Sequence, residues 1–144
     1  MEEYQALATA IRYLMALVTW PGSPDRPLKL AVIGGYGFRT DLNAAFGQGT
    51  VWGRKVEVKY VNQSTFLERV QDFDAVFISP GEESRLPLIL SKIHGKPLLT
   101  MGYAEGLARK GVMVNFMLES NRITLEIHTG QVKDAGLKIG RAHV

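Results

Sequence analysis

The chain has 144 residues, of which 46% are hydrophobic and 22% charged, and its formal net charge is +3. This length and composition are typical of one globular domain, which can bury a sufficient core without disulfides or structural metals. Its basic residues alternate with acidic ones, whereas nucleic-acid-binding proteins gather them on one face. Its apolar stretches fall far short of the ~20 residues that span a bilayer. These features argue against a disordered, membrane-spanning or nucleic-acid-binding chain.

Cysteine is absent from the sequence. Disulfides, thiolate catalysis and cysteine-ligated metal centres are therefore excluded. The chain starts with Met1-Glu2-Glu3, which is acidic where a signal peptide carries basic residues. We therefore recognise no leader in this sequence, and the residues alone leave the cellular compartment open.

The first half of the chain alternates between helical and extended patterns. Apolar side chains recur at three- and four-residue spacing over residues 3–19, which predicts an amphipathic helix. The proline-rich segment 20–24 ends that helix, because proline disfavours helix in the residue before it. A strand is expected at 28–33, a short helix at 41–46, and a strand with alternating apolar residues at 55–61.

The next segment predicts a buried strand between two helices. Ser64 is expected to cap a helix that runs to Gln71. Residues 74–79 form a near-continuous apolar run, which is typical of a strand covered on both faces. A helix is expected at 82–94, with a kink or a late start at Pro87.

The last part of the chain ends in an antiparallel hairpin. The remaining expected elements are a strand at 97–100, a short helix at 104–110, hairpin strands at 112–118 and 123–128 around residues 119–122, and a last helix at 132–138. Together the elements predict one α/β domain over residues 1–144. It is expected to be a three-layer sandwich with a mostly parallel sheet of about five to six strands, the hairpin at its edge and helices on both faces.

Ligands of open α/β sheets bind outside the carboxyl ends of the strands. Those ends are expected at residues 34–38, 79–82 and 100–103, which are rich in glycine and small polar residues. A ligand-binding pocket is one interpretation, and short strand-to-helix turns that need glycine are the other. Residues 35–40 form an incomplete dinucleotide fingerprint, because Thr40 stands where the third glycine belongs. We therefore do not expect a nucleotide site.

No catalytic or metal-binding constellation is recognisable. The first and third strands end in Gly34-Gly35 and Ser79-Pro80, without the carboxylates that a Mg²⁺ site in a phosphate-accepting domain requires. The three histidines lack metal-ligand spacing, and no nucleophile has an evident base. We expect no enzymatic activity, no cofactor and no metal.

Of the three histidines, His128 is the one that we expect to lie beside other polar residues. Glu126 precedes it on the same strand face, and Asn115 lies on the partner strand of the hairpin. Together with Thr100 and Tyr103, these residues suggest a binding site for a small molecule. An ordinary polar pair on an edge strand is the alternative.

The first helix carries more large apolar surface than one core-facing stripe requires. Tyr4, Tyr13, Met15 and Trp20 contribute it, and aromatic and methionine side chains are enriched in protein interfaces. A dimer or partner interface is one interpretation. A helix that simply packs across the sheet is the other.

Several motifs occur in a characteristic order. They are Trp20-Pro21, the segment LKLAVIG at 28–34, DAVFIS at 74–79, PLLT at 97–100, MVNF at 113–116 and ITLEI at 123–127. In this order the chain resembles the YfiR/HmsC-like family of bacterial periplasmic regulators over residues 6–139.

The resemblance implies a small exported α/β protein without enzymatic activity or direct membrane insertion. It would bind the periplasmic sensor domain of an inner-membrane diguanylate cyclase, hold the enzyme inactive, and so lower cyclic-di-GMP and biofilm formation. Family members also form homodimers, and similar domains serve as small-molecule-sensing input modules. The partner-binding residues that we expect are Tyr13, Trp20, Phe38, Glu82, Arg85 and Tyr103.

The chain departs from the family pattern at a few positions. The better-known repressors carry disulfide-forming cysteines at the position of Ala31 and near Asp74, and this chain has none. Gly102-Tyr103 stands where the family often has Ser-Asp, and His128 replaces a usual Asn. Redox control through disulfides is therefore not expected.

Overall fold

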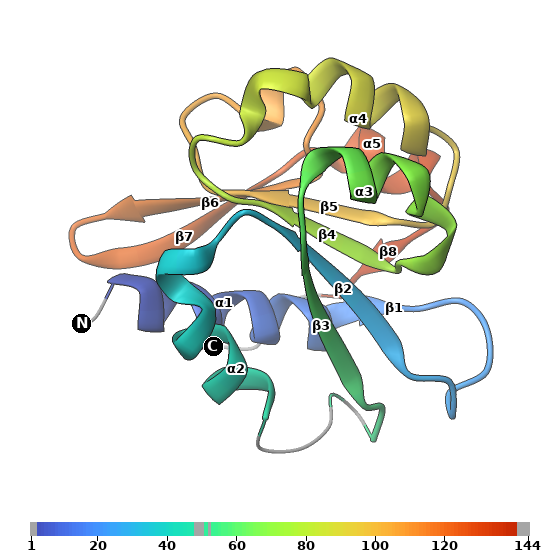
Figure 1. The fold of residues 1–144 in the computed structure, drawn as a ribbon, viewed down its shortest axis with the longest axis horizontal. Coiled ribbons are helices and arrows are strands. Elements are labelled where there is room, and N and C mark those ends of the chain that lie inside the picture. The colour runs from blue at the N-terminus through green and yellow to red at the C-terminus, as the bar shows by residue number, and fades with distance from the viewer. Residues whose placement is uncertain (1–2, 48–50, 52, 141–144) are drawn as a thin grey trace.

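A six-stranded sheet forms the middle layer of the computed structural model, which describes residues 3–47, 51 and 53–140 (Figure 1). The strand order is β3-β2-β4-β5-β6-β7, with all neighbours parallel except the antiparallel pair β6–β7. The strands are β2 (Leu28–Ile33), β3 (Val56–Val61), β4 (Ala75–Ile78), β5 (Leu99–Gly102), β6 (Val114–Glu119) and β7 (Arg122–Ile127). The predicted α/β sandwich with an antiparallel edge is confirmed.

Helices cover both faces of this sheet. The helices α1 (Glu3–Leu17) and α2 (Arg39–Phe46) lie on one face, and α3 (Gln63–Glu68) and α4 (Leu86–Ile93) on the other (Figure 1). A short α5 (Thr129–Asp134) follows β7. The 3₁₀ turns are η1 (Tyr36–Phe38), η2 (Val70–Asp72), η3 (Glu83–Arg85) and η4 (Ala108–Lys110). Across the described ranges, no helix has the length and apolarity needed to traverse a membrane.

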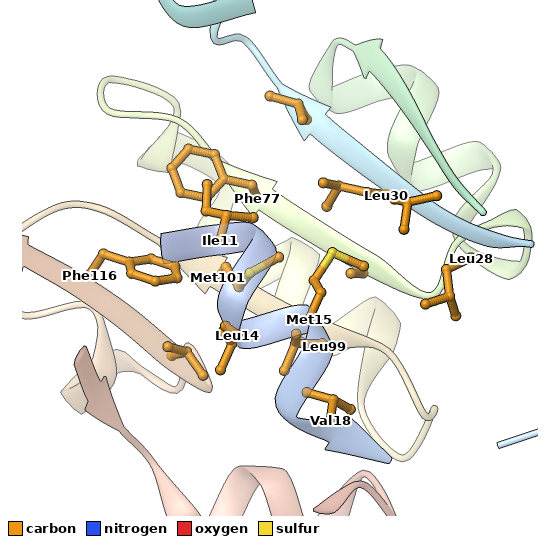
Figure 2. Packing of buried hydrophobic residues seen from close by; sticks show 14 of the residues in the cluster. Ile11, Leu14, Met15, Val18, Leu28, Leu30, Phe77, Leu99, Met101 and Phe116 are labelled. Carbon is orange, nitrogen blue, oxygen red and sulfur yellow. The ribbon is translucent and has the colours of Figure 1, made fainter. Parts of the chain in front are cut away.

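The larger of the two core clusters lies between α1 and the sheet. Ile11, Leu14 and Met15 of α1 are fully buried. Figure 2 shows them against side chains from the strands, among them Phe77 and Met101. Burying each such side chain stabilises the fold by roughly 1.5–3 kcal/mol, so α1 is an integral layer of the domain.

A second, two-stranded sheet joins the segment after α1 to the end of the described chain. The first helix ends at Leu17, because Val18–Thr19 forms strand β1 and pairs antiparallel with β8 (Lys138–Ile139). The expected helix at 132–138 is therefore wrong in its bounds. α5 begins at Thr129 and ends before Gly136, whose φ of 74° is left-handed and breaks the helix.

Two further helix boundaries differ from the sequence prediction. The cap of α3 is Asn62, whose Oδ1 accepts the Thr65 backbone N–H at 2.7 Å, and the predicted Ser64 lies inside the helix. α2 begins at Arg39, because the 3₁₀ turn η1 leads directly into it. The expected late start near Pro87 is confirmed, since α4 begins at Leu86 with proline in its first turn.

The segment around β5 also shifts along the chain. β5 covers Leu99–Gly102, whereas the pattern predicted 97–100, because Leu98 still belongs to a turn bonded to Lys96. The expected helix at 104–110 shortens to the 3₁₀ turn η4. Its first part is held in another conformation by hydrogen bonds between Ala104 and a side chain of β6.

The expected hairpin is present and has a tight turn. Ser120 and Asn121 have φ values of 50° and 62°, as a two-residue turn of type I′ requires. The register pairs Glu119 with Arg122 and continues to Val114 opposite Ile127. β7 thereby becomes the outer strand of the sheet.

Candidate functional site

The topology places a crevice between the carboxyl ends of β2 and β4. The chain passes from β2 to β3 on one side, and then to β4 on the other side. This reversal is the switch point at which open α/β sheets bind ligands or partners. Gly34-Gly35 and Ser79 lie at it, as the sequence predicted.

The side chain of Glu82 occupies this crevice. A Cβ on Gly34 would lie 2.8 Å from the Glu82 Cγ, so glycine is required there for close packing. Gln63 Nε2 donates to the Glu82 Oε1 at 3.2 Å and to its carbonyl oxygen at 3.0 Å. The Glu82 side chain thus joins the start of α3 to the turn after β2, and it covers the backbone of Gly34.

Ser79 carries an unpaired buried hydroxyl at the same place. Its side chain is 3% exposed, and within the described ranges its Oγ has no hydrogen-bond partner. A Cβ on Gly35 would lie only 2.9 Å from that oxygen. The turn therefore packs closely on Ser79 and leaves no room for a side chain at position 35.

An exposed surface adjoins the crevice at the start of α4. We call Glu82, Arg85 and Leu88 the α4 surface. Gln63 binds Glu82, and the adjacent Ser64 receives a long hydrogen bond from Arg85 at 3.5 Å, so both residues are held near α3. Leu88 is 53% exposed, a high value for a large apolar side chain. Arginine is enriched in protein interfaces, so Arg85 beside the exposed Leu88 makes this surface a candidate for contact with a partner.

Tyr103 and Phe38, also expected to bind a partner, have structural contacts. Phe38 is buried, with its ring 5.5 Å from those of Tyr4 and Phe77. The hydroxyl of half-buried Tyr103 donates to the Glu3 carboxylate of α1. Burial and this carboxylate raise the pKa of Tyr103 to about 12.

Tyr13 and Trp20 lie apart from the α4 surface. Tyr13 is 44% exposed on α1. Trp20 is half-buried, and its indole N–H donates to the Met15 carbonyl at 3.0 Å. It leads into the loop that packs at the amino ends of the parallel strands, whereas the α4 surface lies at their carboxyl ends. The six expected partner residues therefore do not form one surface.

Two of the residues expected to bind a small molecule hold the backbone of the β5–β6 region. Thr100 and Asn115 are fully buried. The Thr100 Oγ1 accepts the Met113 N–H at 2.9 Å. The Asn115 amide donates to the Ala104 carbonyl at 2.7 Å and accepts the Ala104 N–H at 3.2 Å.

The other members of that expected cluster do not converge with them. Asn115 lies on the partner strand of the hairpin, as predicted, and the register places it directly opposite Glu126. His128 uses its Nδ1 to accept the Gln131 N–H at 3.2 Å, and so caps α5. Tyr103 is bonded to Glu3 of α1, so the five residues form no common pocket.

A cleft of about 370 Å³ lies between α4, η4 and α5. Thr100 lies at it, with Lys110 and Asp134 as residues of opposite charge. The other lining residues are Leu90, Ser91, Ile93, His94, Gly95, Gly111, Met113, Gln131 and Ala135. Sequence reasoning missed this cleft, because its residues come from distant segments without a shared motif.

The comparison with known families decides what kind of protein this is. A family model described as YfiR/HmsC-like matches residues 4–142, which is nearly the whole chain. The chain belongs to the YfiR/HmsC-like family. No curated protein matches it. The YfiR/HmsC-like family is one of periplasmic regulatory proteins, so membership agrees with the regulatory role that the resemblance implied.

In this YfiR/HmsC-like chain, the positions expected for family cysteines have other contacts. Ala31 is fully buried in the middle of β2. Asp74 accepts two hydrogen bonds from the Arg26 guanidinium, at 2.9 and 3.0 Å, and one from the Lys29 backbone N–H at 2.9 Å. An ion pair thus ties the loop before β2 to the start of β4. Across the described ranges, no group of three or more histidine or acidic residues could hold a metal ion.

Proposed function

We propose that this protein is a periplasmic repressor that acts by contact with the sensor domain of an inner-membrane diguanylate cyclase. It would bind the inactive conformation of the cyclase more tightly than the active one, and so shift the population toward the inactive state. Lower cyclic-di-GMP and less biofilm would follow. Family membership supports the regulatory role.

The α4 surface is the observation that carries this proposal. Arg85 and Leu88 are both exposed at the start of α4, beside the switch point of the sheet. Arginine is one of the residue types that most often dominate the binding energy of protein interfaces, and an exposed apolar side chain beside it gains from burial against a partner. Glu82, fixed by Gln63, offers a carboxylate next to them. We therefore place the cyclase contact here.

The direct test measures binding to purified periplasmic sensor domains of the diguanylate cyclases from the same host. The wild-type chain should bind one of them, and should lower synthesis of cyclic-di-GMP by that full-length cyclase in membrane vesicles. Arg85→Ala and Leu88→Ser should each weaken binding about tenfold or more, as expected for interface anchors.

A matched control is available on the same side of the sheet. Arg69→Ala removes another exposed arginine, which forms only a loose pair with Asp72 at 3.7 Å. This variant should bind like the wild type. Tyr13→Ala and Trp20→Ala test the contacts expected on the first helix. Wild-type binding by Arg85→Ala and Leu88→Ser would exclude the α4 surface. No binding to any cyclase sensor domain would overturn the repressor role.

Two further properties belong to this proposal. It works in the periplasm without inserting into the membrane, and it forms homodimers. Family membership supports the compartment. Fractionation of host cells, with detection of the native protein in the periplasmic fraction, tests it directly.

The cleft between α4 and α5 favours a second candidate function, the sensing of a small molecule. Its volume of about 370 Å³ suits a ligand of amino-acid size. Lys110 and Asp134 would pair with the carboxylate and the ammonium group of a zwitterion, and Thr100 lies at the same cleft.

Thermal unfolding in the presence of free amino acids tests this candidate. A ligand that binds only the folded state raises the melting temperature in a concentration-dependent way. Lys110→Ala and Asp134→Asn should each remove the shift, whereas Lys59→Ala on exposed β3 should retain it. A library of zwitterions that shifts nothing would count against a sensing role.

A further inference from the structure

The outer strand β7 presents an unpaired edge. It forms the end of the sheet, and within the described ranges no strand pairs with its other side (Figure 1). Such an edge is a template for a further strand, and proteins normally protect it. The opposite edge, β3, carries Lys59 in its middle. β7 contains neither lysine nor proline, and its register with β6 is regular.

The hydrogen-bonding groups on the free side of β7 follow from its register. His128 donates its backbone N–H to the Met113 carbonyl at 2.7 Å, just beyond the end of the strand. Antiparallel pairs alternate between bonded and non-bonded positions. Ile123, Leu125 and Ile127 therefore direct their N–H and C=O groups away from β6, to the free edge.

The side chains of this edge have an apolar and a charged face. Leu125 and Ile127 are 38% and 40% exposed, on the face that packs against α1. Arg122 and Glu126 lie on the other face, on either side of Thr124. In the described part of the chain, neither of these charges forms an ion pair.

We propose that two copies of this chain associate through β7, antiparallel, with Thr124 of each copy on the two-fold axis. Arg122 then lies directly opposite Glu126 of the second copy, and the same pair forms again on the other side of the axis. Ile123 and Leu125 of the two copies exchange backbone hydrogen bonds and bring their apolar side chains together. The result is one continuous sheet through both copies.

The free edge of β7 is complementary to itself, so a second copy of this chain fits it better than an unrelated strand. A two-fold axis requires that a surface match itself, and an acid and a base at equal distances on either side of Thr124 satisfy this. Opposite charges at directly facing positions stabilise strand pairs, and side chains are closest at non-bonded positions. This inference rests on the proposed homodimer and adds its interface. It does not depend on the cyclase.

Cysteine crosslinking in the full chain tests the geometry, because the natural sequence has no cysteine. Non-bonded partners in antiparallel strands have Cα atoms about 4.5 Å apart, which suits a disulfide. Thr124→Cys should therefore form a covalent dimer under mild oxidation. Leu125→Cys should not, because its two copies would be roughly 8 Å apart.

Charge exchange tests the pairing independently of covalent bonds. Arg122→Glu and Glu126→Arg each place like charges opposite one another, and should weaken self-association roughly tenfold or more in sedimentation experiments. Mixing these two variants should restore association, because every facing pair is then opposite in sign. The double variant should also dimerise like the wild type.

Each result has a definite meaning. A wild-type chain that remains monomeric at high concentration would overturn the proposed interface and the homodimer together. A dimer that survives both single charge reversals would overturn the β7 interface alone, and crosslinking through Leu125→Cys instead of Thr124→Cys would overturn the register. Cyclase binding is measured separately, so its failure leaves these outcomes unchanged.

Discussion

Arg26 and Asp74, 48 residues apart in the chain, form a two-pronged ion pair at the amino ends of β2 and β4. The aspartate is largely buried and also accepts the Lys29 N–H. The hydrogen bond to Asp74 raises the pKa of Arg26, so the guanidinium stays charged. This ion pair holds the loop before β2 against the start of β4, in a chain that has no cysteine for a disulfide.

Removal of Asp74 should therefore destabilise the fold. Asp74→Ala leaves a charged group and a backbone N–H without their partner, so we expect a loss of about 2 kcal/mol in the free energy of unfolding. Asp72→Ala breaks only the exposed pair with Arg69, and should cost less than about 0.5 kcal/mol. Urea unfolding followed by circular dichroism measures both. Equal losses would show that the Arg26–Asp74 pair has no special role.

Crowding at the β2–β4 switch point should make Gly35 more sensitive than Gly81. Both have positive φ, 77° and 89°, so alanine at either position costs roughly 1–2 kcal/mol. A Cβ at Gly35 would also lie 2.8 Å from the Val32 Cγ1, whereas Gly81 has no heavy atom within 4 Å. Gly35→Ala should cost roughly 1–3 kcal/mol more than Gly81→Ala. A difference near zero would mean that the turn relaxes easily.

The sheet was predictable from the sequence, because its signals are local. The apolar run of β4 and the alternation in β3 are encoded in consecutive residues, and the structure confirms both strands. β1 and β8 were not predictable, since strands of two residues form only by pairing with each other across the domain. Gly34 and Gly35 were correctly expected at the switch point, yet no local pattern indicates that Glu82 covers them.

The candidate residues show the same division between local and distant information. Asn115 was expected on the partner strand of the hairpin, and the structure confirms that strand. Its bonds to Ala104 depend on how the β5–β6 connection folds back, which no spacing rule gives. Likewise, Lys110 and Asp134 meet at one cleft only because η4 and α5 lie side by side.

His128 should stabilise the start of α5 through its imidazole nitrogen. The Nδ1 accepts the Gln131 N–H at 3.2 Å in the capping position. His128→Ala should therefore lower the free energy of unfolding by about 1 kcal/mol. His128→Asn should lose much less, because the asparagine oxygen is also a good cap. Losses of the same size in both variants would show that the cap contributes nothing.

Tyr103 should make the fold sensitive to alkaline pH. Partial burial and the Glu3 carboxylate raise its pKa to about 12, above the ordinary value of about 10. Below pH 10 both the folded and the unfolded chain keep this proton, so its contribution to stability is complete. As the pH rises toward 12, the unfolded chain loses the proton first, and the contribution disappears.

Titration of tyrosinate absorbance tests this expectation in a chain with five tyrosines. Tyr103→Phe should remove a step near pH 12, and should flatten the loss of stability between about pH 10 and 12. Tyr13→Phe, which removes an exposed tyrosine, should leave that step in place. Tyr60, whose pKa burial also raises, remains in both variants. An unchanged titration of Tyr103→Phe near pH 12 would mean that the bond to Glu3 does not hold the proton of Tyr103.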